Sequence, residues 1–509
     1  MRLAALLLAA ALPAQPAGDA ALREALELLY DGGTDGALAR LQELVAAAPQ
    51  DPLPAYISAL ALCWKIEQRP ESTALDAELH RRAQTAIALA EARLRREPAD
   101  ARALLARAGG WGAKGRLQLL RREKRESARS AVRMREDLLA LRALEPDNLE
   151  ASFGLGLYDY YADVLPKLMR LLRLLTGIPG GDRVRGLASI ERARQARLHD
   201  TEARAQLFEI YAFYEDEYDR AHEEMLGLRR RYPGSPLWAL KLAELERDRM
   251  GLCAESAQVA REILAAVDAA HPNYAPIVGV LARLSLGESL LLDLRPAEAR
   301  QALLPVPDAA PALPALGAKA RLLLGRSLEL DGDQNDARAQ YRLAAASADR
   351  ETRRRAQQAL DDPQPAEKTR ALDSVARARR LREAGRPREA AQAYRRALAA
   401  WPGNHEAALG VAEDELALGR IGPARAALEA LVGLRRPDPP WLEPWAWLLL
   451  ARARDLAGER AAALEAYARV RHAPLGREDL RRAAQAGLEA PYRPAGNGAP
   501  GARPLNHSR

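Results

Sequence analysis

A recurring spacing of small residues constrains the fold of this chain more than any other feature of its sequence. Five glycines are each followed five residues later by an alanine and nine residues later by a leucine or tyrosine. These glycines are Gly32, Gly332, Gly385, Gly419 and Gly458. A sixth unit has Asp216 at the glycine position, with Ala221, Met225 and Pro233 in register. Six units that agree at fixed offsets indicate a structural repeat.

The spacing has a simple mechanical interpretation. The glycine makes a tight turn between two helices. The alanine and the large residue are four positions apart, so both face the first helix. A small residue seven positions before each of the five glycines lets the two helices approach closely. Proline ends the second helix in three of the units, at Pro49, Pro402 and Pro474. The unit is therefore predicted to be an antiparallel helix pair.

These positions resemble the tetratricopeptide repeat, which pairs two helices in 34 residues. Gly385 and Gly419 are 34 residues apart. The resemblance implies an all-α fold, a tetratricopeptide-like right-handed α-solenoid of antiparallel helix pairs from about residue 20 to about residue 490. The composition agrees, because Ala, Leu, Arg and Glu favour helix and only 5% of the residues are aromatic.

The chain is predicted to begin with a cleavable signal peptide at residues 1–17. The apolar run from Leu3 to Leu12 follows Arg2, is too short to span a bilayer and precedes two prolines. Cleavage is expected after Ala14 or Ala17, and the alternative is a frayed first helix. No cysteine follows the run, which argues against a lipoprotein anchor. We therefore expect an exported or periplasmic protein, either soluble or peripherally associated with the envelope.

The rest of the chain is predicted to form four segments. Residues 18–360 form a helical repeat array, and a Pro-rich linker at 361–369 separates it from further tetratricopeptide repeats at 370–490. The Gly/Pro-rich tail at 491–509 is predicted to be disordered.

One repeat carries an insertion. Residues 148–164 are predicted to form its first helix and 183–199 its second, with Asp182 as the N-cap. The segment 165–181 between them is predicted to add a helix in the turn of the repeat. On that helix Lys167, Arg170 and Arg173 share an arc of about 120°, and apolar side chains fill most of the remainder. Either the helix is clamped between helix layers, or its apolar face meets a partner or a lipid surface. The three cations are candidate partner-binding residues.

Residues 154–193 also resemble the signature region of the outer-membrane inclusion-body clearance family of repeat proteins. The shared features are a Gly-x-Gly helix, a Leu-Pro, an aliphatic segment and a Gly-Asp-Arg followed by a Gly-Leu helix. This resemblance implies a non-enzymatic adaptor with a lipid-adjacent role. The predicted export departs from the family, whose members are intracellular.

The sequence contains none of the common catalytic motifs. It has no Cys-x-x-Cys, His-Glu-x-x-His, Gly-x-Ser-x-Gly or Walker loop, so no catalytic, cofactor or metal site is predicted. His222 has no second histidine at metal spacing and is interpreted as part of a solvated helix face. Cys63 and Cys253 are expected to be buried free thiols rather than a disulfide.

One basic run resembles a nucleic-acid binding site, but acidic residues are interspersed in it. Arg121, Arg122, Lys124, Arg125, Arg129 and Arg133 lie among Glu123 and Glu126, and no aromatic residues alternate with them. Nucleic acid is therefore not an expected partner.

The function class that remains is a protein–protein interaction scaffold or adaptor of the bacterial cell envelope. It would bind partner peptides or proteins in the groove of the solenoid. The alternative is a peripheral membrane or lipid-surface binding protein that acts through the inserted amphipathic helix. The sequence specifies no oligomeric state.

Overall fold

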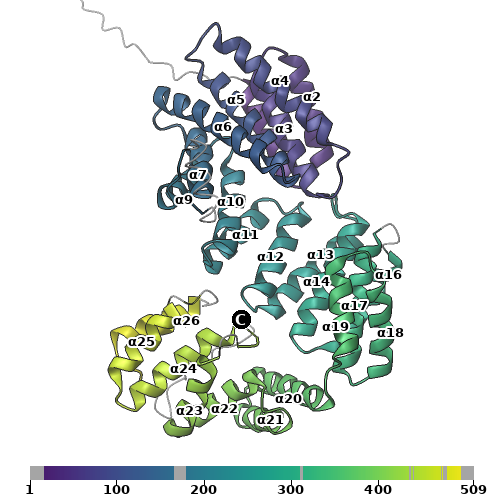
Figure 1. Ribbon diagram of the computed structural model, residues 1–509, viewed down its shortest axis with the longest axis vertical. Coiled ribbons are helices and arrows are strands. Elements are labelled where there is room, and N and C mark those ends of the chain that lie inside the picture. Colours follow the sequence, from purple (N-terminus) through teal and green to yellow (C-terminus); the bar gives the residue numbers. More distant parts are fainter. Residues whose placement is uncertain are drawn as a thin grey trace, which may run out of the picture. The chain divides into compact units, whose positions relative to one another are not determined.

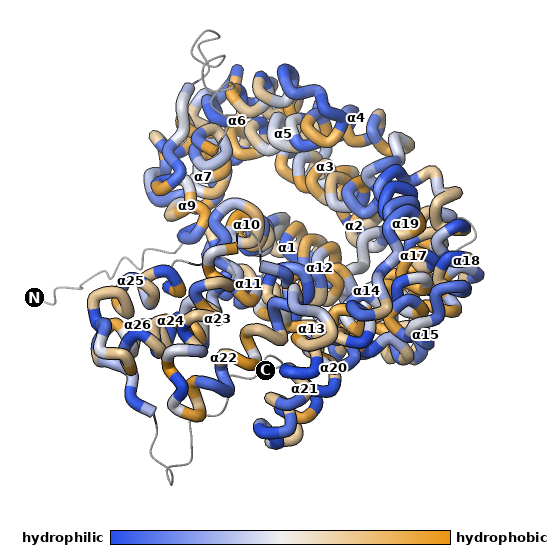
Figure 2. The backbone as a smooth tube through the Cα atoms, turned by 60° about the horizontal axis from the view of Figure 1, so that its bottom comes forward, coloured by the Kyte–Doolittle hydropathy of each residue, from blue (hydrophilic) through white to orange (hydrophobic). Residues whose placement is uncertain are grey.

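The computed structural model describes residues 17–164, 179–309, 313–434, 437–439, 441–471, 473 and 478–494. Every regular element within these ranges is a helix, and consecutive helices run antiparallel in pairs (Figure 1). Polar and apolar residues alternate along the individual helices (Figure 2), as expected where one side of a helix packs against its neighbours. The predicted all-α, tetratricopeptide-like solenoid of antiparallel helix pairs is confirmed.

The chain forms two compact units. The first contains Met1–Leu207 with Arg230–Ser235, and the second contains Phe208–Arg229 with Pro236–Arg509. This division lies elsewhere than the linker predicted at 361–369. That segment connects two helices inside the second unit, and its role as a domain boundary stays a prediction.

The helices of the first unit are, in chain order, α1 (Ala17–Tyr30), α2 (Thr34–Ala47), α3 (Pro52–Glu67), α4 (Asp76–Leu94), α5 (Ala101–Leu120), α6 (Lys124–Leu144), α7 (Leu149–Val164), α9 (Arg183–Arg192) and the first part of α10 (Asp200–Phe213). A short 3₁₀ helix, η1 (Ala193–Gln195), follows α9.

The second unit contains the rest of α10, α11 (Tyr218–Arg231) except its last two residues, and then α12 (Pro236–Asp248), α13 (Cys253–Asp268), α14 (Pro276–Leu292), α15 (Pro296–Leu303), α16 (Val306–Ala309), α17 (Pro314–Leu330), α18 (Gln334–Ala345) and α19 (Arg350–Asp361). It ends with α20 (Ala366–Glu383), α21 (Pro387–Ala400), α22 (His405–Ala417), α23 (Ile421–Val432), α24 (Leu442–Leu456), α25 (Arg460–Arg471) and α26 (Glu478–Glu489).

The six predicted turn residues share a left-handed backbone conformation. Their φ values are +95° at Gly32, +53° at Asp216, +87° at Gly332, +70° at Gly385, +74° at Gly419 and +77° at Gly458. Glycine adopts this conformation at little cost, whereas other residues are strained in it. The second helix of each pair begins two residues after the turn residue. The repeat register predicted from the sequence is therefore the register of the helix pairs.

Two further turns use the same geometry without glycine. Leu294 has φ +56° and Arg122 has φ +65°, and α15 and α6 begin two residues after them. The unit at Leu294 keeps the rest of the pattern, because Ala299 and Leu303 are fully buried at the expected positions. Neither unit has the glycine on which the repeat pattern in the sequence depends.

Close packing within a pair explains the small residue seven positions before the turn: a Cβ at Gly325 of α17 would lie 2.5 Å from Cε1 of Tyr341 in α18. Glycines at other positions let one pair pack closely against the next helix. Gly410 in α22 lies against the ring of Tyr394 in α21, and a Cβ at residue 410 would lie 2.4 Å from Cδ2 of that ring. Tyr394 is only 2% exposed, so the ring has little room to move. The same pairing joins Gly487 of α26 to Tyr467 of α25.

The second helix of the repeat that carries the insertion is shorter than predicted. It was expected over 183–199, but α9 ends at Arg192, η1 follows, and Ala196 is extended with ψ 157°. The physical reason lies in α7, where the Glu150 carboxylate accepts the backbone N–H groups of Arg197 and Leu198 at 2.8 Å each. Those donors are bound to a side chain and cannot continue the helix.

Several predictions concern residues outside the described ranges. The signal peptide falls almost wholly on residues 1–16, and α1 begins at Ala17. Most of the inserted helix falls on residues 165–178, and most of the tail on 495–509. Within the described part of the chain, no helix is both long enough and apolar enough to cross a bilayer. Both cysteines are free thiols; Cys63 is buried and Cys253 partly buried.

Candidate functional site

The predicted partner-binding residues Lys167, Arg170 and Arg173 lie outside the described residues, so their role stays a prediction. The two ends of the segment that contains them are described. The backbone N–H of Arg183 donates to Asp163 Oδ2 at 3.1 Å, and Arg185 Nε donates to Asp159 Oδ2 at 2.9 Å. The end of α7 and the start of α9 are thereby joined, so the described residues on either side of the segment lie at one edge of the first unit.

Glycines allow this close approach. A Cβ at Gly156 of α7 would lie 2.9 Å from the carbonyl oxygen of Gly186 of α9, and a Cβ at Gly181 would lie 2.0 Å from the Asp159 carbonyl oxygen. Asp182 accepts a hydrogen bond from the Arg185 N–H at 2.9 Å and caps α9, as predicted. These residues of the motif therefore hold two helices together rather than bind a ligand.

In the first unit, side chains of α1, α3, α7 and α10, with His199 just before α10, form a buried aromatic–polar cluster. Its members are Tyr30, Tyr56, Trp64, Phe153, His199 and Glu202. Tyr30, His199 and Glu202 are each 3% exposed. Their contacts span α1, α3, α7 and α10, so residues far apart in the sequence fill this part of the unit.

His199 lies at the centre of one half of the cluster. Its ring stacks between Tyr56 and Phe153, at centroid distances of 5.7 and 5.4 Å. Nδ1 lies 2.5 Å from Glu150 Oε2, and Nε2 contacts the Tyr56 hydroxyl. Burial lowers the pKa of His199, but the Glu150 carboxylate more than offsets this effect and the net pKa is raised.

Glu202 organises the other half. Its carboxylate accepts hydrogen bonds from the Trp64 indole and, at 3.4 Å, from the Tyr30 hydroxyl. Arg116 lies 3.4 Å from the same carboxylate and 5.3 Å from the centroid of the Trp64 ring. A partner could reach this part of the first unit only by displacing the unit's own side chains.

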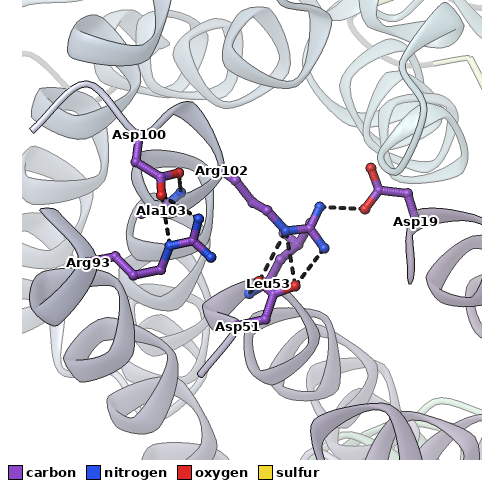
Figure 3. A network of polar contacts seen from close by, with 7 residues as sticks. All are labelled: Asp19, Asp51, Leu53, Arg93, Asp100, Arg102 and Ala103. Carbon is purple, nitrogen blue, oxygen red and sulfur yellow. Dashed lines mark hydrogen bonds and ion pairs between the residues drawn. The ribbon is translucent and has the colours of Figure 1, made fainter. Parts of the chain in front are cut away.

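A neighbouring polar network in the first unit is structural (Figure 3). Arg102 contacts Asp51 at 2.8 Å on one side and Asp19 on the other. Asp51 in turn caps α3 by accepting the Leu53 N–H at 3.1 Å, and Asp100 caps α5 in the same way. The carboxylates of this network therefore stabilise the first turns of α3 and α5.

The second unit contains a charged pocket of about 640 Å³. It lies where α20 meets the α14–α15 turn, the end of α17 and the start of α13. Three arginines and five acidic residues line it: Asp293, Arg295, Glu298, Asp331, Asp373, Arg379, Arg380 and Glu383. We call it the charged pocket.

The inner wall of the charged pocket is a fixed ion-pair network. Arg379 binds Glu406 through two contacts of 2.7 Å and donates to the Leu292 carbonyl at 3.1 Å. Asp293 lies 3.6 Å from the same guanidinium. Burial raises the pKa of Asp293, and Arg379 offsets part of that rise.

The outer wall offers charges that have no partner within the described residues. Asp373 and Arg380 lie seven positions apart on α20, both exposed and both outside any ion pair. Side chains at this spacing lie on the same face of a helix. The pocket can therefore pair with charges of either sign on a bound segment.

In the described part of the chain, no group of three or more His, Cys, Asp or Glu side chains is arranged to hold a metal ion.

One part of the chain matches a known protein family. Residues 381–443 match the family model described as tetratricopeptide repeat, a segment that contains α21, α22 and α23. No curated protein matches the sequence significantly. This region therefore carries a tetratricopeptide repeat, in agreement with the register read from Gly385 and Gly419.

Solved structures of helical repeat proteins are also similar, at low scores. Yeast Tom70 is 11% identical with a TM-score of 0.27, and the match covers 91% of this chain and 99% of that one. The APC/C heterotetramer Cut9–Hcn1 is 14% identical with a TM-score of 0.21, covering 89% of this chain and 86% of that one. Scores this low carry no argument about function.

Sequence reasoning did not find the charged pocket. Its two walls come from the α14–α15 turn and from α20, which are about 80 residues apart. One feature of the sequence points to this region: Ala299 and Leu303 keep the repeat register around Leu294. The pattern built on turn glycines does not include this unit, because leucine replaces the glycine.

Proposed function

We propose that this chain is a non-enzymatic protein–protein interaction scaffold, or adaptor, of the bacterial cell envelope. It binds a partner peptide or protein in the second unit, at the charged pocket. The observation that carries the proposal is the pocket itself: a 640 Å³ recess beside the tetratricopeptide repeat, with exposed charges of both signs on α20.

The contrast between the units supports this assignment. The aromatic–polar cluster of the first unit is filled by the unit's own buried side chains. The charged pocket instead offers Asp373 and Arg380 without ion-pair partners among the described residues. Complementary charges favour a specific partner and a specific orientation.

The partner's chemistry follows from the pocket's lining. A segment that presents a cation towards Asp373 and an anion towards Arg380 would pair with both. The charge of Arg379, in the inner wall of the pocket, is already balanced by Glu406, so this arginine would not select the partner's charge.

The experiment is capture of partners from an envelope extract by the chain from residue 18 onwards. The double variant Asp373→Lys, Arg380→Glu reverses both exposed charges of the pocket and leaves the net charge unchanged. Arg377→Glu is the control, because Arg377 is exposed on the same helix but does not line the pocket. Loss of a defined partner in the double variant alone is the expected result. Equal capture by all three proteins would overturn the proposal.

The envelope location rests on the apolar run from Leu3 to Leu12. Export predicts a mature protein that starts at Gln15 or Gly18, which N-terminal sequencing of the envelope fraction measures. An intact Met1 on protein recovered from the cytoplasm would contradict export.

A second candidate function is peripheral binding to a lipid surface, through the helix predicted at 165–181 with its cations Lys167, Arg170 and Arg173. The observation that favours it is the exposure of apolar side chains beside cations at the edge from which this segment emerges.

A further inference from the structure

The two most exposed large apolar side chains in the described part of the chain both belong to the first unit. Val184, at the start of α9, is 80% exposed, and Leu119, at the end of α5, is 62% exposed. Single exposed apolar residues are ordinary on a protein surface. Val184 and Leu119 differ from such isolated residues because of their positions and the cations near Leu119.

Both residues lie at the same edge of the unit. Leu104 near the start of α5 and Ala151 near the start of α7 share a core cluster with Leu138 and Leu141 of α6. The ends of α5 and α7 therefore lie together at the opposite edge. The start of α9 lies there too, because Gly186 packs against the backbone of Tyr160 near the end of α7.

Three cations follow Leu119 in the turn between α5 and α6 and at the start of α6. Arg122, Lys124 and Arg125 are all exposed and form no ion pair with any residue that the structure describes, and Glu123 is the one acid between them. Arg121 differs, because it is bound to Asp76 at 2.6 Å and to two backbone carbonyls. The cations that follow Arg121 are left facing solvent.

The position of Arg122 is unusual within the repeat. It has φ +65° at the turn position that glycine occupies in six other helix pairs, the α12–α13 pair with Gly251 included. A glycine would fit this backbone with less strain. The chain instead presents a cation at the tip of the turn.

We infer that this edge docks on the surface of an anionic lipid bilayer. We call Leu119, Arg122, Lys124, Arg125 and Val184 the basic edge. Cations near an anionic surface are attracted to its headgroups, and aliphatic side chains beside them enter the interface.

The composition of the edge favours lipid over a protein partner. Protein interfaces concentrate aromatic side chains in a contiguous, buried centre. The exposed residues of 117–126 and 179–188 are aliphatic, small or charged, and none is aromatic. Isolated aliphatic side chains among cations suit a fluid interface better than a fitted one. This inference deepens the lipid-surface candidate with residues outside the inserted segment, and it does not depend on the charged pocket.

The test is co-sedimentation of the full mature chain with vesicles of phosphatidylglycerol and phosphatidylcholine, compared with phosphatidylcholine alone. Arg122→Gln, Lys124→Gln and Arg125→Gln are combined in one variant. The matched control combines Arg95→Gln, Arg96→Gln and Arg142→Gln, which are exposed cations at the other edge of the same unit, without an ion pair among the residues that the structure describes. Each cation near the surface contributes a factor of about five to binding. The edge variant is expected to lose about a hundredfold in affinity, and the control to lose much less.

The apolar contribution is tested in the same assay. Leu119→Gln with Val184→Gln is expected to weaken binding at high salt, where the cations are screened. Leu144→Gln is the control, because Leu144 is 44% exposed at the other edge. Circular dichroism of each variant checks the fold.

Three outcomes overturn the inference: unchanged vesicle binding by the edge variant, equal losses in the edge variant and its control, or no binding of the wild-type chain to anionic vesicles. If the edge variant instead loses a protein captured from the extract, the edge is a protein-docking surface and the lipid assignment is wrong. Vesicle binding that fails while capture through the charged pocket persists would leave the scaffold proposal standing.

Discussion

The Arg379 guanidinium meets the Glu406 carboxylate through two contacts of 2.7 Å, joining the first helices of two successive repeats, α20 and α22. Both side chains are largely buried, with 15% and 8% of their surfaces exposed. Arg379 lines the inner wall of the charged pocket, and Glu406 holds it from outside the lining. The two residues are 27 positions apart, so their contact also fixes the spacing between the two repeats.

The Arg379–Glu406 pair gives the first prediction. Glu406→Ala leaves a buried guanidinium with only Asp293 and one carbonyl as partners, and should lower the free energy of unfolding by about 3 kcal/mol. Urea denaturation measures the loss. The control is Glu351→Ala, which breaks the exposed Arg354–Glu351 pair and should cost about 0.5 kcal/mol or less. Equal effects of the two substitutions would show that burial of the Arg379–Glu406 pair does not increase its contribution to the free energy of unfolding.

The contact between Gly410 and Tyr394 gives the second prediction. Gly410→Ala places a Cβ where the Tyr394 ring now lies and should destabilise the second unit by about 1–3 kcal/mol. Gly422→Ala is the matched control, because no atom lies within 4 Å of the added Cβ and alanine favours helix. Thermal unfolding should therefore shift down for residue 410 and slightly up for residue 422. A Gly410→Ala protein as stable as the wild type would contradict this account of the close packing between α21 and α22.

His199 gives a pH-dependent prediction. Its pKa is raised in the folded protein above the unfolded value of about 6.5. The protonated ring beside Glu150 therefore contributes stability that is fully present below pH 6.5 and is lost as the pH rises through the folded pKa. The stability difference between the wild-type chain and His199→Gln should be larger at pH 5.5 than at pH 8, as measured by urea denaturation at both values. A difference that is constant or grows with pH would refute the assignment.

Arg122 gives a prediction in which stability and binding change in opposite directions. Arg122→Gly relieves a left-handed backbone at an exposed position without ion pairs and should raise the free energy of unfolding by about 0.5–1 kcal/mol. The same change removes one cation of the basic edge and should weaken anionic vesicle binding. Gly385→Ala, at φ +70°, should destabilise instead. An Arg122→Gly protein that is less stable would show that the side chain has a structural role.

The sequence predicts this fold well where the determinants are local. The turn at Gly385, the cap at Asp182 and the pairing of alanine with a large residue four positions later on the second helices all follow from residues within about ten positions. The unit at Leu294 escaped detection because leucine at a left-handed turn is unusual. The end of α9 escaped because Glu150, almost 50 residues earlier, binds the backbone there.

The candidate sites were harder to predict for a related reason. The charged pocket joins Asp293 to Arg379, and the aromatic–polar cluster joins Tyr56 to His199, across 86 and 143 positions. No periodic pattern connects such residues. They come together only when successive helix pairs stack, and the stacking depends on side-chain volumes across several repeats.

The most direct test of the scaffold proposal is photo-crosslinking from inside the charged pocket. A photoreactive phenylalanine analogue at Ala297, an exposed lining residue, is irradiated in living cells, with the same analogue at Arg377 as the control. The account predicts a discrete adduct with one partner protein at residue 297, absent at residue 377 and absent when Asp373→Lys, Arg380→Glu is added. No adduct at residue 297, or the same adduct from both positions, would contradict it.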